Sequence, residues 1–170
     1  MIYVIGLIAV ALGVALDQFT KYLAVAYIKE SPVILIDGVF RLHYLENRGA
    51  AFGMLQNQQW FFLIITVVTL CLIALIYVKL PHTKHFIPLR ICLLALATGA
   101  IGNMIDRIRL QYVIDFFYFE LIDFPIFNVA DIFATISTIV LILLLLFFYS
   151  EEDFDLIFQL LKPKKKEDQG

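Results

Sequence analysis

Hydrophobic positions in this chain gather into four long runs that are separated by shorter polar segments. The runs cover about residues 2–28, 59–78, 86–105 and 131–149. Each run approaches the roughly 20 residues that an α-helix needs to cross the hydrocarbon core of a bilayer. No Lys or Arg precedes the first run, and its helical pattern continues, so we interpret it as an uncleaved span rather than a signal peptide. The pattern predicts four transmembrane helices in a single domain over residues 1–150.

The segment between the first two runs has a different periodicity. Residues 33–36 and 39–45 are rich in β-forming side chains, and they flank the pair Asp37-Gly38. An Asp-Gly pair between two such stretches is a strong signal for a β-hairpin. We therefore expect an all-α membrane protein with four transmembrane helices and a small extracytoplasmic β-hairpin or β-sheet element.

The last twenty residues differ again in pattern. Residues 151–161 place apolar side chains at helical spacing after an acidic start, and residues 162–170 are charged. An amphipathic helix of this kind lies on a membrane surface, whereas a short charged tail has too little apolar surface to fold. We expect residues 151–170 to form a cytoplasmic amphipathic segment and tail.

Composition and charge agree with the pattern and add an orientation. The chain has 170 residues, 62% hydrophobic and 16% charged, with a net charge of −2 that gives no sign of a nucleic-acid partner. Soluble domains are roughly half apolar and about a quarter charged. Basic residues are densest in the tail and in the 79–90 connector, which predicts cytoplasmic termini. Residues 29–57 and 107–128 would then be extracytoplasmic.

Several polar residues stand where the third run ends and the fourth begins. Asn103, Asp106 and Arg107 are spaced by three and four positions, so on a helix they share one face. Asn128 and Asp131 are spaced by three at the start of the fourth run. By themselves Asn128 and Asp131 could simply cap a helix, and Asp106 and Arg107 could form an interfacial ion pair.

Further polar groups are predicted on the same side of the membrane. Asp17 and Lys21 share a helix face near the end of the first run, Asn47 follows the hairpin, and Asp115 lies in the connector before the fourth run. A charge among hydrocarbon needs a partner or a function. The convergence of these groups at one end of the spans therefore favours a functional site.

Two carboxylates without a credible Ser-His or metal-binding set suggest aspartic peptidase chemistry. Two nearby aspartates can share one proton, so that one activates water and the other protonates the scissile amide. His43, His82 and His85 are scattered, so neither a histidine base nor a bound metal is expected.

Two other classes of protein remain open at this point. A small four-helix transporter could relay protons through the same carboxylates, although it would place them near the bilayer midplane. A non-enzymatic assembly partner could use the polar residues only to join helices, which leaves Asp115 unexplained.

Five motifs, in order along the chain, resemble those of the bacterial lipoprotein signal peptidases, also called signal peptidase II. They are DQFTK at 17–21, NRGAAFG at 47–53, GNMIDR at 102–107, VIDF at 113–116 and FNVAD at 127–131. Thr98 and Gln111 depart from the family pattern, because glycine is usual at both positions.

The resemblance implies a peptidase of the bacterial cytoplasmic (inner) membrane that cleaves prolipoproteins on the amino side of a diacylglyceryl-modified cysteine. It implies membrane lipid as a partner, inhibition by cyclic peptide antibiotics such as globomycin, and no cofactor. Asp115 and Asp131 would be the catalytic pair. The residues that would bind substrate or support the pair are Asp17, Lys21, Asn47, Gly49, Asn103, Asp106, Arg107, Asn128 and Ala130.

Overall fold

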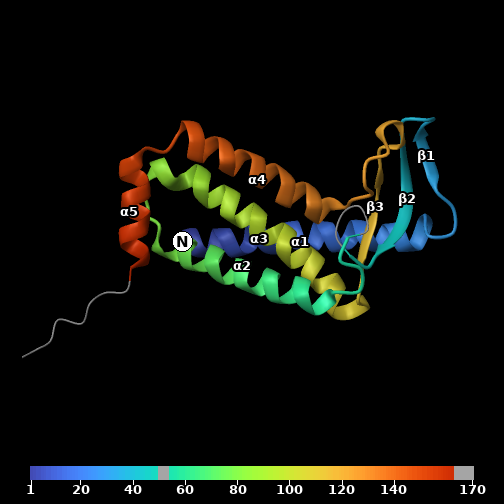
Figure 1. Ribbon diagram of the computed structural model, residues 1–170, viewed down its shortest axis with the longest axis horizontal. Coiled ribbons are helices and arrows are strands. Elements are labelled where there is room, and N and C mark those ends of the chain that lie inside the picture. The colour runs from blue at the N-terminus through green and yellow to red at the C-terminus, as the bar shows by residue number, and fades with distance from the viewer. Residues whose placement is uncertain (50–53, 163–170) are drawn as a thin grey trace, which may run out of the picture.

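Four long helices form the body of the molecule (Figure 1). The computed structural model describes residues 1–49 and 54–162. The helices are α1 (Ile2–Tyr27), α2 (Gln59–Lys79), α3 (Ile87–Leu110) and α4 (Val129–Phe147). Each belongs to a segment that is long and apolar enough to cross a membrane, which confirms the predicted fold class. Residues 50–53 of the second motif and the charged tail at 163–170 lie outside the described residues.

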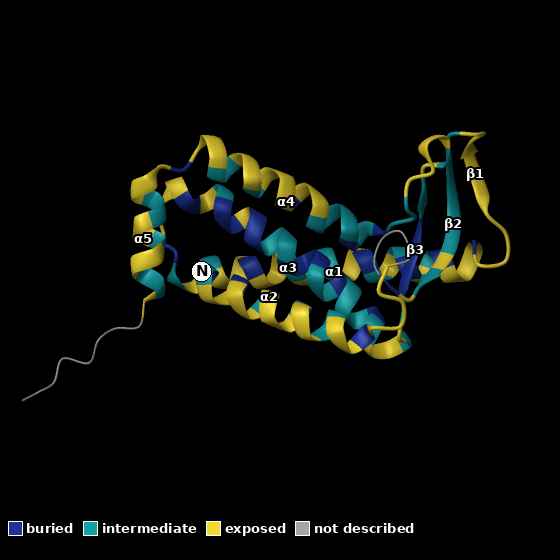
Figure 2. Cartoon of the chain, viewed as in Figure 1, coloured by how far each residue is buried: buried dark blue, intermediate teal, exposed yellow. Residues whose placement is uncertain are grey.

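α3 is the central helix of the bundle. Half of its most apolar window is buried inside the protein, compared with 11% for each of the other three helices. The surfaces of α1, α2 and α4 are accordingly rich in exposed apolar residues (Figure 2). Apolar side chains on the outside of such a bundle match a hydrocarbon solvent, and of these four helices α3 is the one most enclosed by protein.

A three-stranded antiparallel sheet stands at one end of the bundle (Figure 1). The strands are β1 (Val33–Ile36), β2 (Phe40–Asn47) and β3 (Val113–Tyr118), in the order β1-β2-β3. The predicted hairpin is confirmed, and Gly38 takes a φ of 67° in its turn. β3 was not predicted as a strand, because its pairing with β2 joins parts of the chain that are far apart in sequence.

The sheet is held by packing against the outer part of α1. Ala24 and Ile28 form a buried cluster with Ile114 and Phe116 of β3. Alternate residues of a strand point to opposite faces. Asp115 therefore points away from this cluster, toward the ends of α3 and α4.

The helix termini at the sheet end differ from the predicted spans. α3 continues beyond the expected end at Ile105 to Leu110, because helical hydrogen bonding does not stop at the hydrocarbon boundary. α4 begins at Val129, where Asn128 is the N-cap and forms a reciprocal capping box with Asp131. Capping and site roles were alternatives for these two residues, and the capping interaction is present.

The structure shows how the chain accommodates Thr98 and Gln111, the two residues that stand where the family usually has glycine. Gln111 ends α3 in a left-handed conformation with φ 65°, which glycine adopts without steric cost. Thr98 is buried, and its methyl group lies opposite Gly13 of α1, where a Cβ would come within 2.6 Å. The bulk at Thr98 is therefore accommodated by a glycine on the facing helix.

The opposite end of the bundle holds the N-terminus and is crossed by α5 (Glu151–Leu161) (Figure 1). The predicted terminal helix is thus present. Its residues Phe154 and Ile157 pack on a cluster that includes Tyr149 and Leu80, while Phe158 stays exposed. Part of the apolar face of α5 is consequently used against the bundle itself. A short 3-10 helix, η2 (Lys84–Phe86), leads from this end into α3.

Candidate active site

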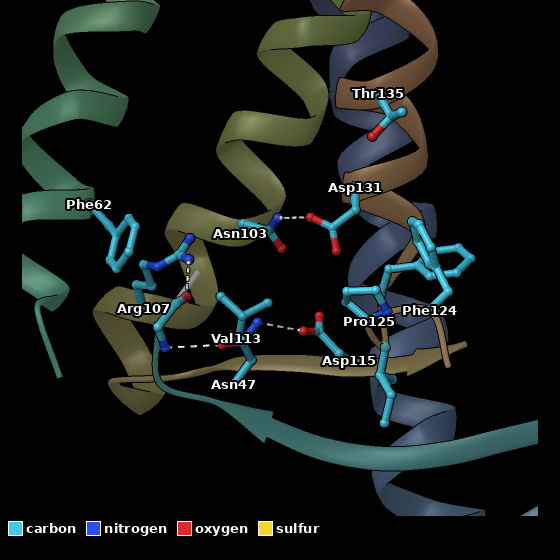
Figure 3. A pocket seen from close by; sticks show the side chains of 13 residues that line it. Asn47, Phe62, Asn103, Arg107, Val113, Asp115, Phe124, Pro125, Asp131 and Thr135 are labelled. Carbon is cyan, nitrogen blue, oxygen red and sulfur yellow. Dashed lines mark hydrogen bonds between the residues drawn. The ribbon is translucent and has the colours of Figure 1, made fainter. Parts of the chain in front are cut away.

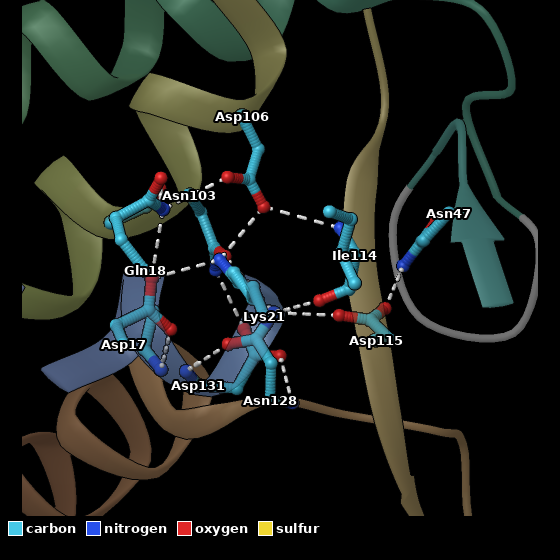
Figure 4. Close-up of polar contacts among 12 residues, drawn as sticks. Asp17, Gln18, Lys21, Asn47, Asn103, Asp106, Ile114, Asp115, Asn128 and Asp131 are labelled. Carbon is cyan, nitrogen blue, oxygen red and sulfur yellow. Dashed lines mark hydrogen bonds and ion pairs between the residues drawn. The ribbon is translucent and has the colours of Figure 1, made fainter. Parts of the chain in front are cut away.

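A buried lysine links α1 to α3 at the sheet end (Figure 4). Lys21 is only 1% exposed, and its Nζ lies 3.0 Å from Asp17 Oδ2 and 2.9 Å from Asp106 Oδ2. It also donates a hydrogen bond of 2.9 Å to Asn103 Oδ1. An ammonium group has three donors, so all three are used here. Asp17 and Lys21, which were predicted to share a helix face, are therefore part of a larger cluster, which we call the Lys21 cluster (Asp17, Lys21, Asn103 and Asp106).

The two carboxylates of this cluster also hold the starts of α4 and β3. Asp17 Oδ1 accepts the backbone N–H of Ala130 at 2.8 Å, and Asp106 Oδ2 accepts that of Ile114 at 3.2 Å. Gly102 makes room for this arrangement, because a Cβ there would lie 2.6 Å from Asp17 Oδ2. Ala130, a predicted site residue, thus contributes its backbone N–H.

Gln18 belongs to the same network, although it was not predicted as a site residue. Its Nε2 donates to Asp106 Oδ1 at 2.9 Å and to Asp17 Oδ2 at 3.2 Å. Its place beside Asp17 in the first motif was the one available signal. A side chain amide that bridges two carboxylates keeps them in place without adding charge.

Asp115 is almost fully buried, at 1% exposure, and both of its carboxylate oxygens are bonded. Oδ2 accepts from Asn47 Nδ2 at 2.9 Å, and Oδ1 accepts from Asn128 Nδ2 at 2.6 Å. Asn47 is itself oriented by the backbone N–H of Gly49, which donates to its Oδ1 at 3.0 Å. Two amides from separate elements therefore fix the position of this carboxylate.

The pKa of the Asp115 carboxyl is raised toward neutral pH. Burial raises the pKa of its carboxyl to about 7, and the negative charge of Asp131 acts in the same direction. The hydrogen bonds from Asn47 and Asn128 and the charge of Lys21 oppose this rise in pKa. A carboxyl with such a pKa can both hold and release a proton near pH 7.

Asp131 lies in the first turn of α4 and is fixed in a similar way. Its Oδ1 accepts from Asn103 Nδ2 at 2.8 Å, and its Oδ2 accepts from the backbone N–H of Asn128 at 3.0 Å. The side chain of Asn128 also donates to Asn103 Oδ1 at 3.0 Å. Asn128 therefore donates to both carboxylates, to that of Asp115 through its side chain and to that of Asp131 through its backbone.

Both aspartates line one pocket of about 300 Å³ (Figure 3). Apolar side chains of α2 and of the segment before α4 form its other walls, including Phe62, Phe124 and Phe127. Arg107 also lines it, with its guanidinium 4.6 Å from the ring centroid of Phe62. The pocket thus combines fixed carboxylates with apolar walls. The apolar lining residues lie in hydrophobic stretches, where no local pattern distinguishes them from other lipid-facing or core positions.

The predicted site residues occupy two layers at this end of the bundle. Those that line the pocket are Asn47, Gly49, Asn103, Arg107, Asp115 and Asp131. Those that lie behind it are Asp17, Lys21, Asp106, Asn128 and Ala130. Over residues 1–49 and 54–162, no group of three or more His, Cys, Asp or Glu side chains is placed to hold a metal ion.

Fold and site together define a small integral membrane protein with a two-aspartate pocket at one end of a four-helix bundle. Residues 9–147 match the signal peptidase II family. A lipoprotein signal peptidase of Streptococcus pyogenes serotype M5 (strain Manfredo) is 43% identical over 154 residues, which cover 90% of this chain and 96% of that protein. The lipoprotein signal peptidase of serotype M3 (strain ATCC BAA-595 / MGAS315) has the same identity and coverage.

Two solved bacterial membrane enzymes have a similar fold. One, determined in meso at 2.3 Å resolution, has a TM-score of 0.72 and 34% identity, covering 83% of this chain and 87% of its own. The other, at 1.9 Å, has a TM-score of 0.71 and 33% identity, covering 85% and 94%. The chain therefore belongs to the signal peptidase II family and is a membrane-spanning peptidase. Neither the transporter nor the assembly partner fits this assignment.

Proposed function

We propose that this peptidase removes signal peptides from prolipoproteins, cleaving on the amino side of the diacylglyceryl-modified cysteine by an aspartic mechanism. The observation that carries the proposal is that Asp115 and Asp131 line one pocket, with both oxygens of each carboxylate held by N–H donors. The name of the Streptococcus pyogenes relatives supports lipoproteins as the substrate class.

In this mechanism the two carboxyls share one proton and act on a water molecule between them. The ionised carboxylate takes a proton from the water, and the water oxygen attacks the scissile carbonyl carbon. The protonated carboxyl donates to the carbonyl oxygen. The tetrahedral intermediate then collapses as the carboxyl that took the water proton gives it to the leaving amide nitrogen, and the hydroxyl formed from the carbonyl oxygen returns its proton to the other carboxylate. The raised pKa of Asp115 supports proton exchange of this kind near neutral pH.

The location of the pocket suits a substrate that is anchored in the bilayer. It lies where the helices meet the sheet, and its walls include Phe62 of α2 and Thr135 of α4. A diacylglyceryl-modified protein can reach such a site sideways from the lipid. Cyclic peptide antibiotics such as globomycin would compete for the same pocket.

For orientation, we infer that both termini are cytoplasmic and that the pocket faces outward in the bacterial cytoplasmic membrane. The N-terminus and α5 lie at the end opposite the sheet (Figure 1), and Lys79, Lys84 and Arg90 stand in or next to the connector between α2 and α3 at that end. Reporter fusions at Ser150 and near Pro81 should report the cytoplasm, and one near Asp37 the outside. Reversed signals would contradict the orientation.

The decisive experiment for the mechanism is cleavage of a lipidated prolipoprotein by the purified protein in detergent. Asp115→Asn and Asp131→Asn keep the size of the side chain and one accepting oxygen but remove the base. Each should lower kcat/KM by more than about a thousandfold, while globomycin still binds. The double variant should be no worse, because residues that act as a unit are not additive.

Asp37→Asn, in the exposed hairpin turn, is the matched control and should cleave like the wild type. Treatment with a metal chelator is expected to leave the rate unchanged. Substantial cleavage by either Asp115→Asn or Asp131→Asn, at matched expression and folding, would contradict the two-aspartate mechanism.

A further inference from the structure

The connector between β3 and α4 exposes several large apolar side chains. It contains the short 3-10 helix η3 (Glu120–Ile122), in which Leu121 and Ile122 are each 69% exposed. Phe119 and Phe124 on either side are 41% and 46% exposed. We call these four residues the connector tip. Exposed apolar residues gathered in this way indicate a surface that another apolar phase covers.

The acidic residues within the connector are turned back toward the sheet. Asp123 Oδ1 accepts the hydroxyl hydrogen of Tyr118 at 2.6 Å, and Glu120 pairs with Arg41 of β2 at 3.5 Å. Asp123 also takes a left-handed conformation with φ 48°, which reverses the chain locally. The polar groups thus contact the sheet, and the apolar side chains of the connector tip are left on the outside.

The connector is anchored, so this exposure does not arise from a loose loop. The backbone N–H of Leu121 donates to Val39 O at 3.4 Å, and that of Phe124 donates to Phe119 O at 3.1 Å. The ring of Phe119 lies 4.7 Å from that of Phe40 in β2. These contacts hold the connector tip in one orientation relative to the sheet.

The connector turns at the edge of the sheet and then returns to the bundle. In Figure 1 it leaves the end of β3 beside the β1–β2 turn and runs back along β3 into α4. Figure 2 shows exposed residues on both the connector and α4. On α4, exposed apolar residues such as Ile136, Ile139 and Leu143 continue down the span. The headgroup region adds roughly 5–7 Å to each side of the hydrocarbon, which is where a segment just before α4 would lie.

We propose that the connector tip inserts into the outer headgroup and upper acyl region of the bilayer, beside the pocket. The partner is membrane lipid, because the apolar surface of the connector tip continues the surface that α4 presents to hydrocarbon. Phe124 also lines the pocket, so the inserted segment brings the lipid surface to the wall of the site. This inference depends on the membrane-spanning bundle and not on the cleavage mechanism.

The test is tryptophan fluorescence in phosphatidylcholine vesicles. Trp60 is the single tryptophan of the chain, so a Trp60→Phe background is free of native emission. In that background, Leu121→Trp should show blue-shifted emission and lose more than about half of its intensity when the lipids carry brominated acyl chains. Emission typical of water, without lipid quenching, would overturn the proposal.

Ser31→Trp in the same background is the matched control. Ser31 is exposed, and it lies in the polar link between α1 and β1. Its emission should be quenched by aqueous iodide and not by brominated lipid. Equal lipid quenching at positions 31 and 121 would also overturn the proposal, because the connector tip would then be no distinct membrane contact. Because the readout needs no cleavage, its failure is separable from failure of the aspartic mechanism.

Discussion

The two ends of the bundle each bury a cation, and they hold it in different ways. At the sheet end, Lys21 is bound by the carboxylates of Asp17 and Asp106, side chains that come from two helices. At the α5 end, Arg90 is 3% exposed and donates to the backbone carbonyls of Tyr77 at 3.0 Å and Leu80 at 2.6 Å. The first arrangement uses full charges, and the second uses the end of α2.

This difference in the partners of the two cations distinguishes the end that holds the candidate active site from the end that does not. Carbonyls at a helix C-terminus carry only a partial negative charge and belong to one local segment, so the Arg90 arrangement amounts to a helix cap. A carboxylate costs more free energy to bury than a carbonyl, but it can accept additional hydrogen bonds from other helices and strands. Asp17 and Asp106 use theirs to hold Ala130 and Ile114, at the starts of the two segments that carry the pocket aspartates.

The largest expected effect is that of Lys21→Met. Removing the cation leaves two buried carboxylates without their partner, which costs about 3–5 kcal/mol of stability. We expect a large drop in the unfolding temperature in detergent and loss of cleavage. Lys29→Met is the control. Lys29 is half-exposed, and its Nζ lies 3.9 Å from Glu46 Oε1, a long surface ion pair that contributes about 0–1 kcal/mol to stability. Similar unfolding temperatures for the two variants would refute the structural role of the Lys21 cluster.

A second prediction uses the pH dependence of stability at the sheet end. Burial raises the pKa of Asp115 to about 7, so between roughly pH 4 and pH 7 the folded protein binds its proton more tightly than the unfolded chain. The contribution of Asp115 to stability is therefore fully present at low pH and is lost as pH rises. Asp115→Asn removes this dependence and should lose less stability than the wild type as the pH is raised from 4 to 8.

The measurement is a series of thermal unfolding curves in detergent from pH 4 to pH 8. The unfolding temperature of Asp115→Asn relative to that of the wild type should rise with pH. A variant Asp115→Asn that follows the wild-type curve at every pH would show that the carboxyl titrates no differently in the folded state.

The smallest effect is expected at the other end of the bundle. Arg90→Met removes two hydrogen bonds, and it leaves neutral carbonyls rather than charged carboxylates behind, so no buried charge loses its partner. We expect a moderately lower unfolding temperature and an unchanged kcat/KM at temperatures where the variant is folded. Loss of cleavage by a folded Arg90→Met protein would break the distinction between the two ends.

Local features of the sequence determined much of this protein. The four spans follow from the apolarity of windows of about 20 residues, and the hairpin follows from the Asp37-Gly38 turn between two β-forming stretches. The spacing of Asn128 and Asp131 predicts the capping box that is observed. Each of these is fixed by residues within a few positions of one another, so a single sequence is sufficient.

Other features were decided only by the tertiary structure. β3 is a strand because it pairs with β2. Lys21 is buried because α3 packs against the face of α1 that carries it and places Asp106 beside its ammonium group. Gln18 and Phe62 acquire their places in the same way, by contacts with residues far along the chain. Motifs can point to the residues of the site, but hydrogen bonds across more than eighty positions depend on how the helices pack, and no local pattern encodes that packing.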